Sequence, residues 1–190
     1  MKNILVLDNY DSFTYNLVHY IEKFTDKKVD VFRNDKISLK DIEKYDKILL
    51  SPGPGLPIDS GILMDLIKTY HKTKSIFGIC LGLQAITQVF GGKLNNLNNV
   101  FHGVAKKTII KDPTEPLFKN IPIVFNSGRY HSWVASRENF PECLSITAED
   151  EEGLIMAIKH KVYDVKAVQF HPESILTDYG EKIIDNWINE

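Results

Sequence analysis

Residues 75–92 read SIFGICLGLQAITQVFGG. The run at 75–79 is short and largely apolar, which is typical of a strand buried on both faces of a parallel sheet. Residues 83–90 then have the composition of an apolar helix, and the glycines at 91 and 92 predict its end. The stretch therefore predicts a strand, a tight turn and a helix, which is the unit from which α/β folds are assembled.

The same alternation of strand and helix runs through the first half of the chain. We predict further buried strands at 4–7, 29–32 and 47–50, and helices at 15–24 and 62–70. This order predicts an α/β fold with an open, mainly parallel central sheet flanked by helices.

The second half has apolar segments without long helices between them. Strands are predicted at 106–110, 124–125, 144–148, 155–159 and 167–170, and a closing helix at 183–188. Strands that follow one another without crossover helices favour a smaller antiparallel extension of the sheet.

Composition places the chain among ordinary globular proteins. It has 190 residues, of which 43% are hydrophobic and 25% are charged, and no linker divides it, so one domain over 1–190 is expected. A net charge of −2 argues against nucleic-acid binding. No signal peptide and no run of about 18 apolar residues is found, which predicts a cytoplasmic protein with no membrane role.

The turn between the strand and the helix carries the pattern of a nucleophile elbow. Its residues are Gly78, Ile79, Cys80, Leu81 and Gly82, in the form G-x-nucleophile-x-G. So tight a turn strains the nucleophile's backbone and leaves no room for side chains two residues away. It would also place Cys80 at a helix N-terminus, which favours the thiolate. The alternative is a structural cysteine in a glycine-containing turn.

A thiol nucleophile needs a base, and the base needs a group that orients it. Both are present at His171 and Glu173, which lie two residues apart and so point the same way in an extended segment. Pro172 between them restricts the backbone. The alternative is a loop histidine beside a solvated glutamate.

The segment 51–57, SPGPGLP, follows a predicted strand. Its prolines make it stiff and remove backbone donors, while Gly53 and Gly55 keep their N–H groups and allow a ligand to approach the backbone closely. Open α/β sheets bind ligands at the carboxyl ends of their strands. A second oxyanion donor from this loop is therefore expected, although a rigid turn without a ligand would have the same composition.

These motifs together resemble those of the class I, triad-type glutamine amidotransferases. More narrowly, the chain is similar to the glutaminase subunits of anthranilate synthase and aminodeoxychorismate synthase. The resemblance spans essentially the whole chain and rests on DNYDSFT at 8–14, SPGPG at 51–55, GICLGLQ at 78–84, RYHS at 129–132 and QFHPES at 169–174. It implies the flavodoxin-like α/β fold of that family.

The resemblance also implies roles for individual residues. Cys80 would be the nucleophile, His171 the acid and base, and Glu173 the group that orients the histidine. The backbone N–H groups of Gly53 and Leu81 would form the oxyanion hole. The residues implied to bind glutamine are Gly53, Pro54, Gly55, Gln84, Ser132 and Trp133. This branch more often has leucine where Trp133 stands, a change that a backbone contact would tolerate.

The implied reaction is hydrolysis of L-glutamine through a cysteinyl thioester, with ammonia delivered to a chorismate-binding synthase component I. An anthranilate-forming partner is favoured, and an aminodeoxychorismate-forming partner is the alternative. No cofactor and no metal site are expected in this chain, and any Mg²⁺ would belong to the partner. His102 and His131 lie too far apart in sequence to indicate a metal pair.

Several other residues have simpler explanations. Asp8 and Asp11 are expected to hold the loop and to cap the helix that follows it. Tyr10 and Phe13 are expected to lie at a surface that contacts a partner. Cys143 is expected to be an inert free thiol. The position of His131 inside a family motif leaves open whether it lies near the site.

Two other classes of function compete with that of a glutaminase component. One is a stand-alone cysteine hydrolase built on the same elbow, which would cleave its substrate without a partner. The other is a non-catalytic flavodoxin-like binding module, which would need no activated thiol. An inert thiol reacts with alkylating agents only near its ordinary pKa of about 8.5, so alkylation of Cys80 separates this module from the enzymes.

Overall fold

The computed structural model describes residues 3–98 and 100–190. Within these ranges the strands form a nine-stranded sheet and a separate two-stranded sheet. Five neighbouring strands of the large sheet are parallel, in the order β2 (Val29–Arg33), β1 (Ile4–Asp8), β3 (Lys47–Leu50), β4 (Ser75–Ile79) and β11 (Val165–Val168). The predicted parallel sheet is confirmed.

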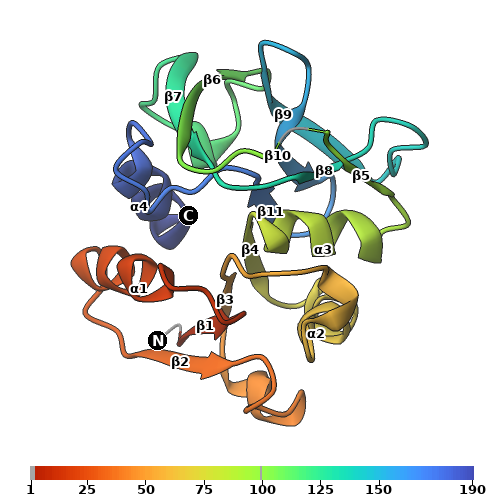
Figure 1. The fold of residues 1–190 in the computed structure, drawn as a ribbon. Coiled ribbons are helices and arrows are strands. Elements are labelled where there is room, and N and C mark those ends of the chain that lie inside the picture. The colour runs from red at the N-terminus through yellow and green to blue at the C-terminus, as the bar shows by residue number, and fades with distance from the viewer. Residues whose placement is uncertain (1–2, 99) are drawn as a thin grey trace.

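An antiparallel extension continues the same sheet beyond β11 and appears in the upper part of Figure 1. Its strands are β10 (Ile155–His160), β9 (Leu144–Asp150), β6 (Val104–Ile110) and β7 (Val124–Arg129). The extension was predicted and is confirmed. Because the last parallel strand, β11, comes from the end of the chain, one sheet joins both halves of the chain.

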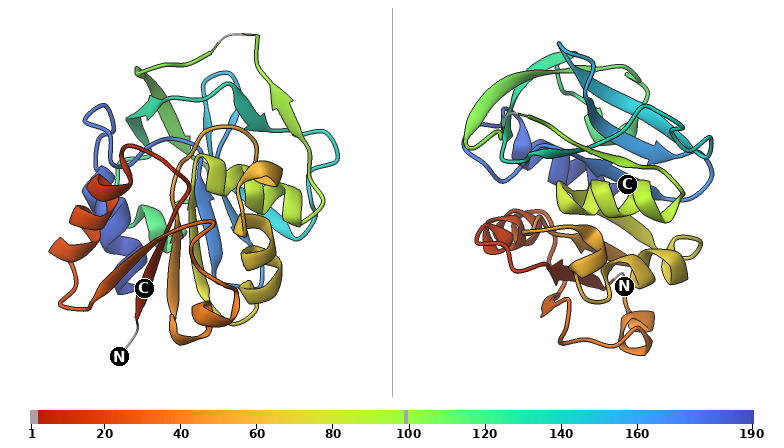
Figure 2. Two further views of the ribbon diagram at one scale, coloured as in Figure 1. Left: turned by 60° about the horizontal axis from the view of Figure 1, so that its bottom comes forward. Right: turned by 45° about the vertical axis from the view of Figure 1, so that its right-hand side comes forward.

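Two helix layers cover the parallel strands, as the left view in Figure 2 shows. α1 (Thr14–Lys23) and α4 (Gly180–Asn189) pack on one face, and α2 (Leu63–Tyr70) and α3 (Leu81–Val89) on the other. In β1, Ile4 and Val6 join the core beneath α1 and α4, whereas Leu5 and Leu7 join the core beneath α2 and α3. This two-sided burial explains why the predicted strands are continuous apolar runs.

Several predicted bounds were wrong. The strand predicted at 124–125 extends to Arg129, the one predicted at 167–170 ends at Val168, and α3 begins at Leu81 rather than at 83. The two-stranded sheet of β5 (Leu94–Asn96) and β8 (Trp133–Ala135) was not predicted. Three 3₁₀ turns were missed as well: η1 (Lys40–Lys44), η2 (Pro57–Asp59) and η3 (Pro116–Phe118).

The carboxyl ends of the parallel strands meet at one edge of the sheet. The segments that follow β1, β3, β4 and β11 are 9–13, 51–57, the turn at Cys80 and 169–173. The sequence motifs that follow these four strands therefore lie together at one edge of the sheet, as expected for an open α/β fold.

None of the helices in the described part of the chain is long and apolar enough to cross a membrane.

Candidate active site

The turn after β4 has the strained geometry predicted for an elbow. Cys80 precedes α3 with φ of 50° and ψ of −96°, a conformation that is costly for a residue with a side chain. A Cβ at Gly78 would lie 2.7 Å from the carbonyl carbon of Gly82, and one at Gly82 would lie 3.0 Å from the carbonyl oxygen of Leu50. Gly78 is thus required by the close approach of strand and helix, and Gly82 leaves little room for a side chain beside Leu50.

His171 and Glu173 form a buried pair in the segment after β11. Nδ1 of His171 lies 2.6 Å from Oε1 of Glu173, and both residues are about 4% exposed. The backbone N–H of His171 donates to the carbonyl of Gly128 over 3.2 Å. The imidazole is therefore fixed in orientation, with its other nitrogen, Nε2, left for Cys80.

The electrostatics of His171 depend on Cys80. Burial lowers the pKa of His171, but its interactions with Cys80 and then with Glu173 outweigh burial and raise that pKa well above its usual value. In the described part of the chain no group meets the geometry of a hydrogen bond to Nε2. Cys80 therefore influences the imidazole as a near neighbour, without a hydrogen bond to Nε2.

The loop after β3 is tied down by Asn9. The backbone N–H of Asn9 donates to Oγ of Ser51 and its side-chain amide donates to the Ser51 carbonyl, each over 2.8 Å. A Cβ at Gly53 would lie 2.4 Å from the Asn9 carbonyl oxygen and 3.0 Å from Cδ2 of Leu81. Gly53 is therefore held beside Leu81, which brings together the two residues expected to supply the oxyanion hole.

A cavity of about 250 Å³ opens beside the Cys80 side chain. All six residues predicted to bind glutamine stand in its walls, which are lined by Gly53, Pro54, Gly55, Cys80, Gln84, Tyr130, His131, Ser132 and Trp133. Separate segments of the sequence thus surround one space of a size suited to a small polar molecule.

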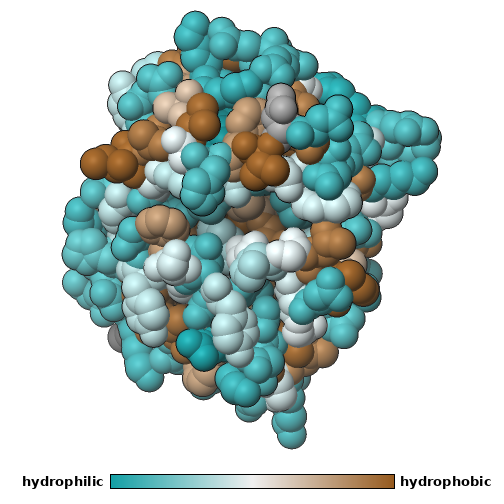
Figure 3. Space-filling model, in the orientation of Figure 1, coloured by the Kyte–Doolittle hydropathy of each residue, from teal (hydrophilic) through white to brown (hydrophobic). Residues whose placement is uncertain are grey.

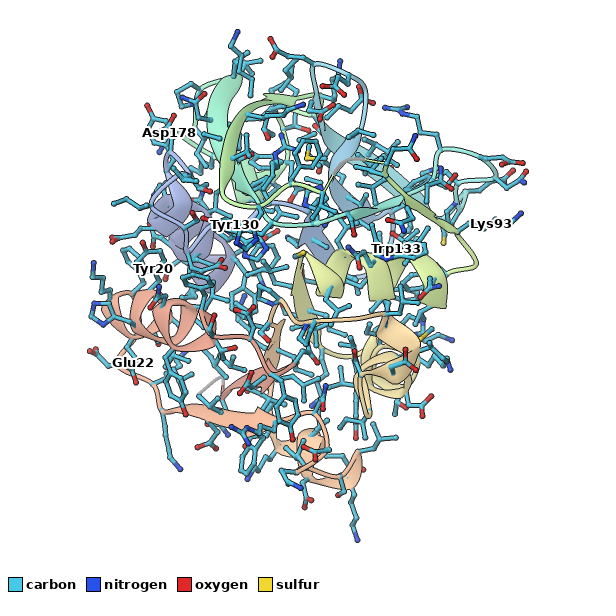
Figure 4. All side chains as sticks on the ribbon, in the orientation of Figure 1. Tyr20, Glu22, Lys93, Tyr130, Trp133 and Asp178 are labelled. Carbon is cyan, nitrogen blue, oxygen red and sulfur yellow. The ribbon has the colours of Figure 1, made fainter. Side chains whose placement is uncertain are left out.

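Gln84 and Trp133 are joined directly. The side-chain amide of Gln84 donates to the backbone carbonyl of Trp133 over 2.9 Å. Figure 4 shows Trp133 over α3 and Tyr130 beyond the amino-terminal end of that helix. This contact uses the backbone carbonyl of Trp133 and so does not depend on the side chain at position 133.

A second cavity, of about 360 Å³, adjoins the first and is also lined by Cys80. It shares Gly53, Pro54, Cys80 and Tyr130 with the first cavity, and His171 lines only this one. Its remaining lining comes from Pro52, His102 and the segment Tyr10, Asp11, Ser12 and Phe13. Cys80 therefore stands between a pocket with glutamine-binding candidates and a pocket with the proposed base.

The mouth of the second cavity carries exposed aromatic side chains. Tyr10 and Phe13 are 46% and 40% exposed, and the ring of Phe13 lies 6.2 Å from that of Tyr130. On the face drawn in Figure 3, apolar residues stand in separate groups among polar ones. Exposed aromatic residues at the rim of a site are a common feature of surfaces that bind another protein.

Sequence reasoning missed three residues of the site and left a fourth open. Asn9 and Tyr130 were not singled out individually, and neither was Gln169, whose Nε2 lies 3.5 Å from Sγ of Cys80. The two-residue spacing of Gln169 from His171 was the signal for the last of these. His131 lines the first cavity, and burial, with the nearby charges of Arg129 and His171, lowers its pKa to about 3.

Asp8 has a structural role. Oδ1 of Asp8 accepts hydrogen bonds from the backbone of Tyr10 and Asp11 and from the Thr14 hydroxyl. The predicted role of Asp8 in holding this loop is thus confirmed. Within residues 3–98 and 100–190, no group of three or more histidine, cysteine, aspartate or glutamate side chains is arranged to hold a metal ion.

The sequence model of the class-I glutamine amidotransferases matches residues 5–190. The chain belongs to this family. A solved Thermoplasma acidophilum protein, described as part of a GMP synthase, has the same fold, with a TM-score of 0.88 at 24% identity over 100% of this chain and 93% of that one.

Relatives of similar length place the chain in a narrower group. It is 46% identical to anthranilate synthase component 2 of Cyanophora paradoxa over 98% of both chains. It is 42% identical to the aminodeoxychorismate/anthranilate synthase component 2 of Bacillus subtilis, over 97% of this chain and 95% of that one. The chain spans 51% of the multifunctional tryptophan biosynthesis protein of Pichia angusta, at 43% identity. These relatives confirm the resemblance stated from the motifs.

Proposed function

We propose that this chain is the glutaminase component of a chorismate-using synthase. The observation that carries the proposal is the position of Cys80, strained at the elbow between a pocket with glutamine-binding candidates and a buried His171–Glu173 pair. A structural cysteine would need neither the strain nor the two cavities.

The proposed reaction uses side chains and backbone groups of this chain alone and has two stages. The Cys80 thiol gives its proton to Nε2 of His171, and the thiolate attacks the side-chain amide carbon of glutamine. The N–H groups of Gly53 and Leu81 stabilise the oxyanion. His171 returns the proton to the amide nitrogen, the C–N bond breaks, and ammonia leaves a γ-glutamyl thioester on Cys80.

The second stage releases glutamate. His171 removes a proton from water, the hydroxide adds to the thioester carbon, and the C–S bond breaks as the thiolate regains its proton. Glu173 carries no proton in either stage; it holds the imidazole through Nδ1 and stabilises its charged form.

The arrangement of the two cavities supports a partner that receives ammonia. His171 lines the second cavity, so the leaving nitrogen is protonated on that side, between the loop at Tyr10 and Phe13 and the ring of Tyr130. Ammonia in neutral water is mostly ammonium, which is not a nucleophile. We therefore infer that the synthase component docks over this mouth and takes up ammonia before it reaches the solvent.

We favour the anthranilate-forming synthase as the partner. Relatives that cover almost the whole chain have anthranilate synthase in their names, and the Bacillus subtilis relative is named for aminodeoxychorismate as well. A role with both synthases is the second candidate, and that relative is the observation that favours it.

The test measures glutamine hydrolysis by the purified chain alone and with each chorismate-using component I, with and without chorismate. The proposal predicts slow hydrolysis alone and strong activation by at least one partner, greatest with the anthranilate-forming one. Full turnover by the isolated chain, unchanged by either partner, would instead support a stand-alone cysteine hydrolase. No hydrolysis under any condition would support a non-catalytic module.

A further inference from the structure

A fully buried amide lies against the sulfur of Cys80. Gln169 has no exposed surface, and its Nε2 lies 3.5 Å from Sγ of Cys80. We propose that Gln169 donates a hydrogen bond to the Cys80 thiolate and so favours the reactive form of the nucleophile. The inference rests on the proposed function, because it assigns a further catalytic residue to the same site.

The sheet fixes Gln169 opposite Cys80. Val168 is in register with Ile79, so the next residues along β11 and β4, Gln169 and Cys80, continue as neighbours. The backbone N–H of Cys80 donates to the Val168 carbonyl over 2.8 Å, and the backbone N–H of Gln169 donates to the carbonyl of Met156 over 2.9 Å. The contact between amide and sulfur is therefore set by backbone hydrogen bonds on both sides and not by a mobile loop.

Gln169 is placed to act on the thiol and not on a substrate. It lines neither of the two cavities beside Cys80, whereas His171, two residues further on, lines the second. One segment thus supplies both the base that exchanges a proton with the sulfur and an uncharged donor that contacts the same atom.

The chemistry of the amide determines the direction of its effect. An N–H group bonds more strongly to an anionic acceptor than to a neutral one, so a donor at this distance stabilises the thiolate relative to the thiol. A carbonyl oxygen in the same place would accept from S–H and stabilise the thiol. Removing the side chain therefore shifts thiol ionisation to higher pH if Gln169 donates, and to lower pH if it accepts.

The experiment measures the alkylation rate of Cys80 by iodoacetamide between pH 5 and 10. A Cys143→Ser background leaves one thiol to react. Gln169→Met keeps the chain length without a donor, and Gln169→Asn keeps the amide but withdraws it by one methylene group. Val168→Ala is the matched control, because it loosens the same buried strand without removing the donor. Circular dichroism and thermal melts identify the variants that fold.

The inference predicts that the alkylation midpoint rises by about one pH unit in the Gln169 variants and stays unchanged in Val168→Ala. An unchanged or lower midpoint in a folded Gln169 variant would overturn it. The alkylation midpoint of Cys80 in the parent protein shows whether only this inference fails or the proposed function fails with it. If its own Cys80 titrates near about 8.5, the thiol is not activated and the proposed function fails as well.

Discussion

The backbone N–H of Cys80 donates to the carbonyl oxygen of Val168 over 2.8 Å. This bond ties the elbow after β4 to β11, the strand that leads directly to His171. Two motifs far apart in sequence are thereby held at adjacent strand ends by the same sheet that supports the core. The distance between thiol and imidazole is consequently a property of the sheet rather than of a flexible loop.

Replacement of the thiol should separate the two halves of the reaction. Cys80→Ser should lower glutamine-dependent activity by at least about 10³-fold, because the serine hydroxyl is a far weaker nucleophile here. Activity of the complex with added ammonium salts should be retained, since that route bypasses Cys80. Steady-state assays of the complex with each nitrogen source provide the check. Retention of glutamine hydrolysis within tenfold of the parent protein would rule out Cys80 as the nucleophile.

The base and its orienting group should differ in the size of their effects. His171→Ala removes the group that moves protons in both stages, whereas Glu173→Gln only weakens its orientation and charge stabilisation. The loss in kcat for Glu173→Gln should be roughly 10- to 100-fold smaller. Single-turnover measurement of thioester formation and breakdown ranks the two variants. A Glu173 variant that folds and is the more damaged would reverse the proposed roles.

The elbow should be intolerant of a methyl group at Gly78. Its Cβ would lie 2.7 Å from the carbonyl carbon and 2.9 Å from the carbonyl oxygen of Gly82, so Gly78→Ala should lower the free energy of unfolding by about 1–3 kcal/mol. Gly91→Ala is the control: φ there is +94° but nothing lies within 4 Å, so only the backbone cost of about 1 kcal/mol applies. Urea denaturation compares them, and equal losses would refute the steric explanation.

Burial of His131 should make stability depend on pH. Its pKa is lowered to about 3 in the folded chain, against about 6.5 when unfolded. Below pH 6.5 the unfolded chain therefore binds a proton that the folded chain does not, and stability falls with pH down to about 3. Between pH 7 and 5 this contribution is about 2 kcal/mol.

His131→Gln removes that titrating group. Its free energy of unfolding should thus fall less than that of the parent protein over the same pH range, as measured by urea titrations at both pH values. The raised pKa of His171 acts with the opposite sign, since its contribution is complete below about pH 6.5 and is lost as pH rises through its folded value. His171 is present in both proteins and cancels in the comparison. Identical pH dependences would show that His131 is not held neutral by burial.

The features predicted best from the sequence are the strands that helices bury on both faces. The strand expected at 75–79 matches β4, and the one at 47–50 matches β3, because parallel strands covered by helices need apolar residues throughout. β7 was cut short at Phe125 because it continues with polar residues. Their partners are distant in sequence: Ser127 pairs with the Thr108 hydroxyl, and the buried Arg129 lies 3.7 Å from the Asp150 carboxylate. Polar residues whose partners are distant in sequence leave no pattern in the local sequence from which a strand could be predicted.

Part of the candidate site could also be predicted from the sequence. Motif spacing identified Cys80, His171 and the loop at Gly53, which the structure brings together. It did not show that Cys80 lies between two cavities, or that Gln169 reaches its sulfur, because both features arise only when β11 from the end of the chain is placed beside β4.

The most direct test of the account is to locate the acyl group itself. The complex with component I is mixed with glutamine, quenched in acid within one turnover, digested and analysed by mass spectrometry. We predict a γ-glutamyl group on the peptide that contains Cys80, and its absence when Cys80→Ser is treated in the same way. Glutamine hydrolysis with no label on Cys80, or with label on Cys143, would contradict the account.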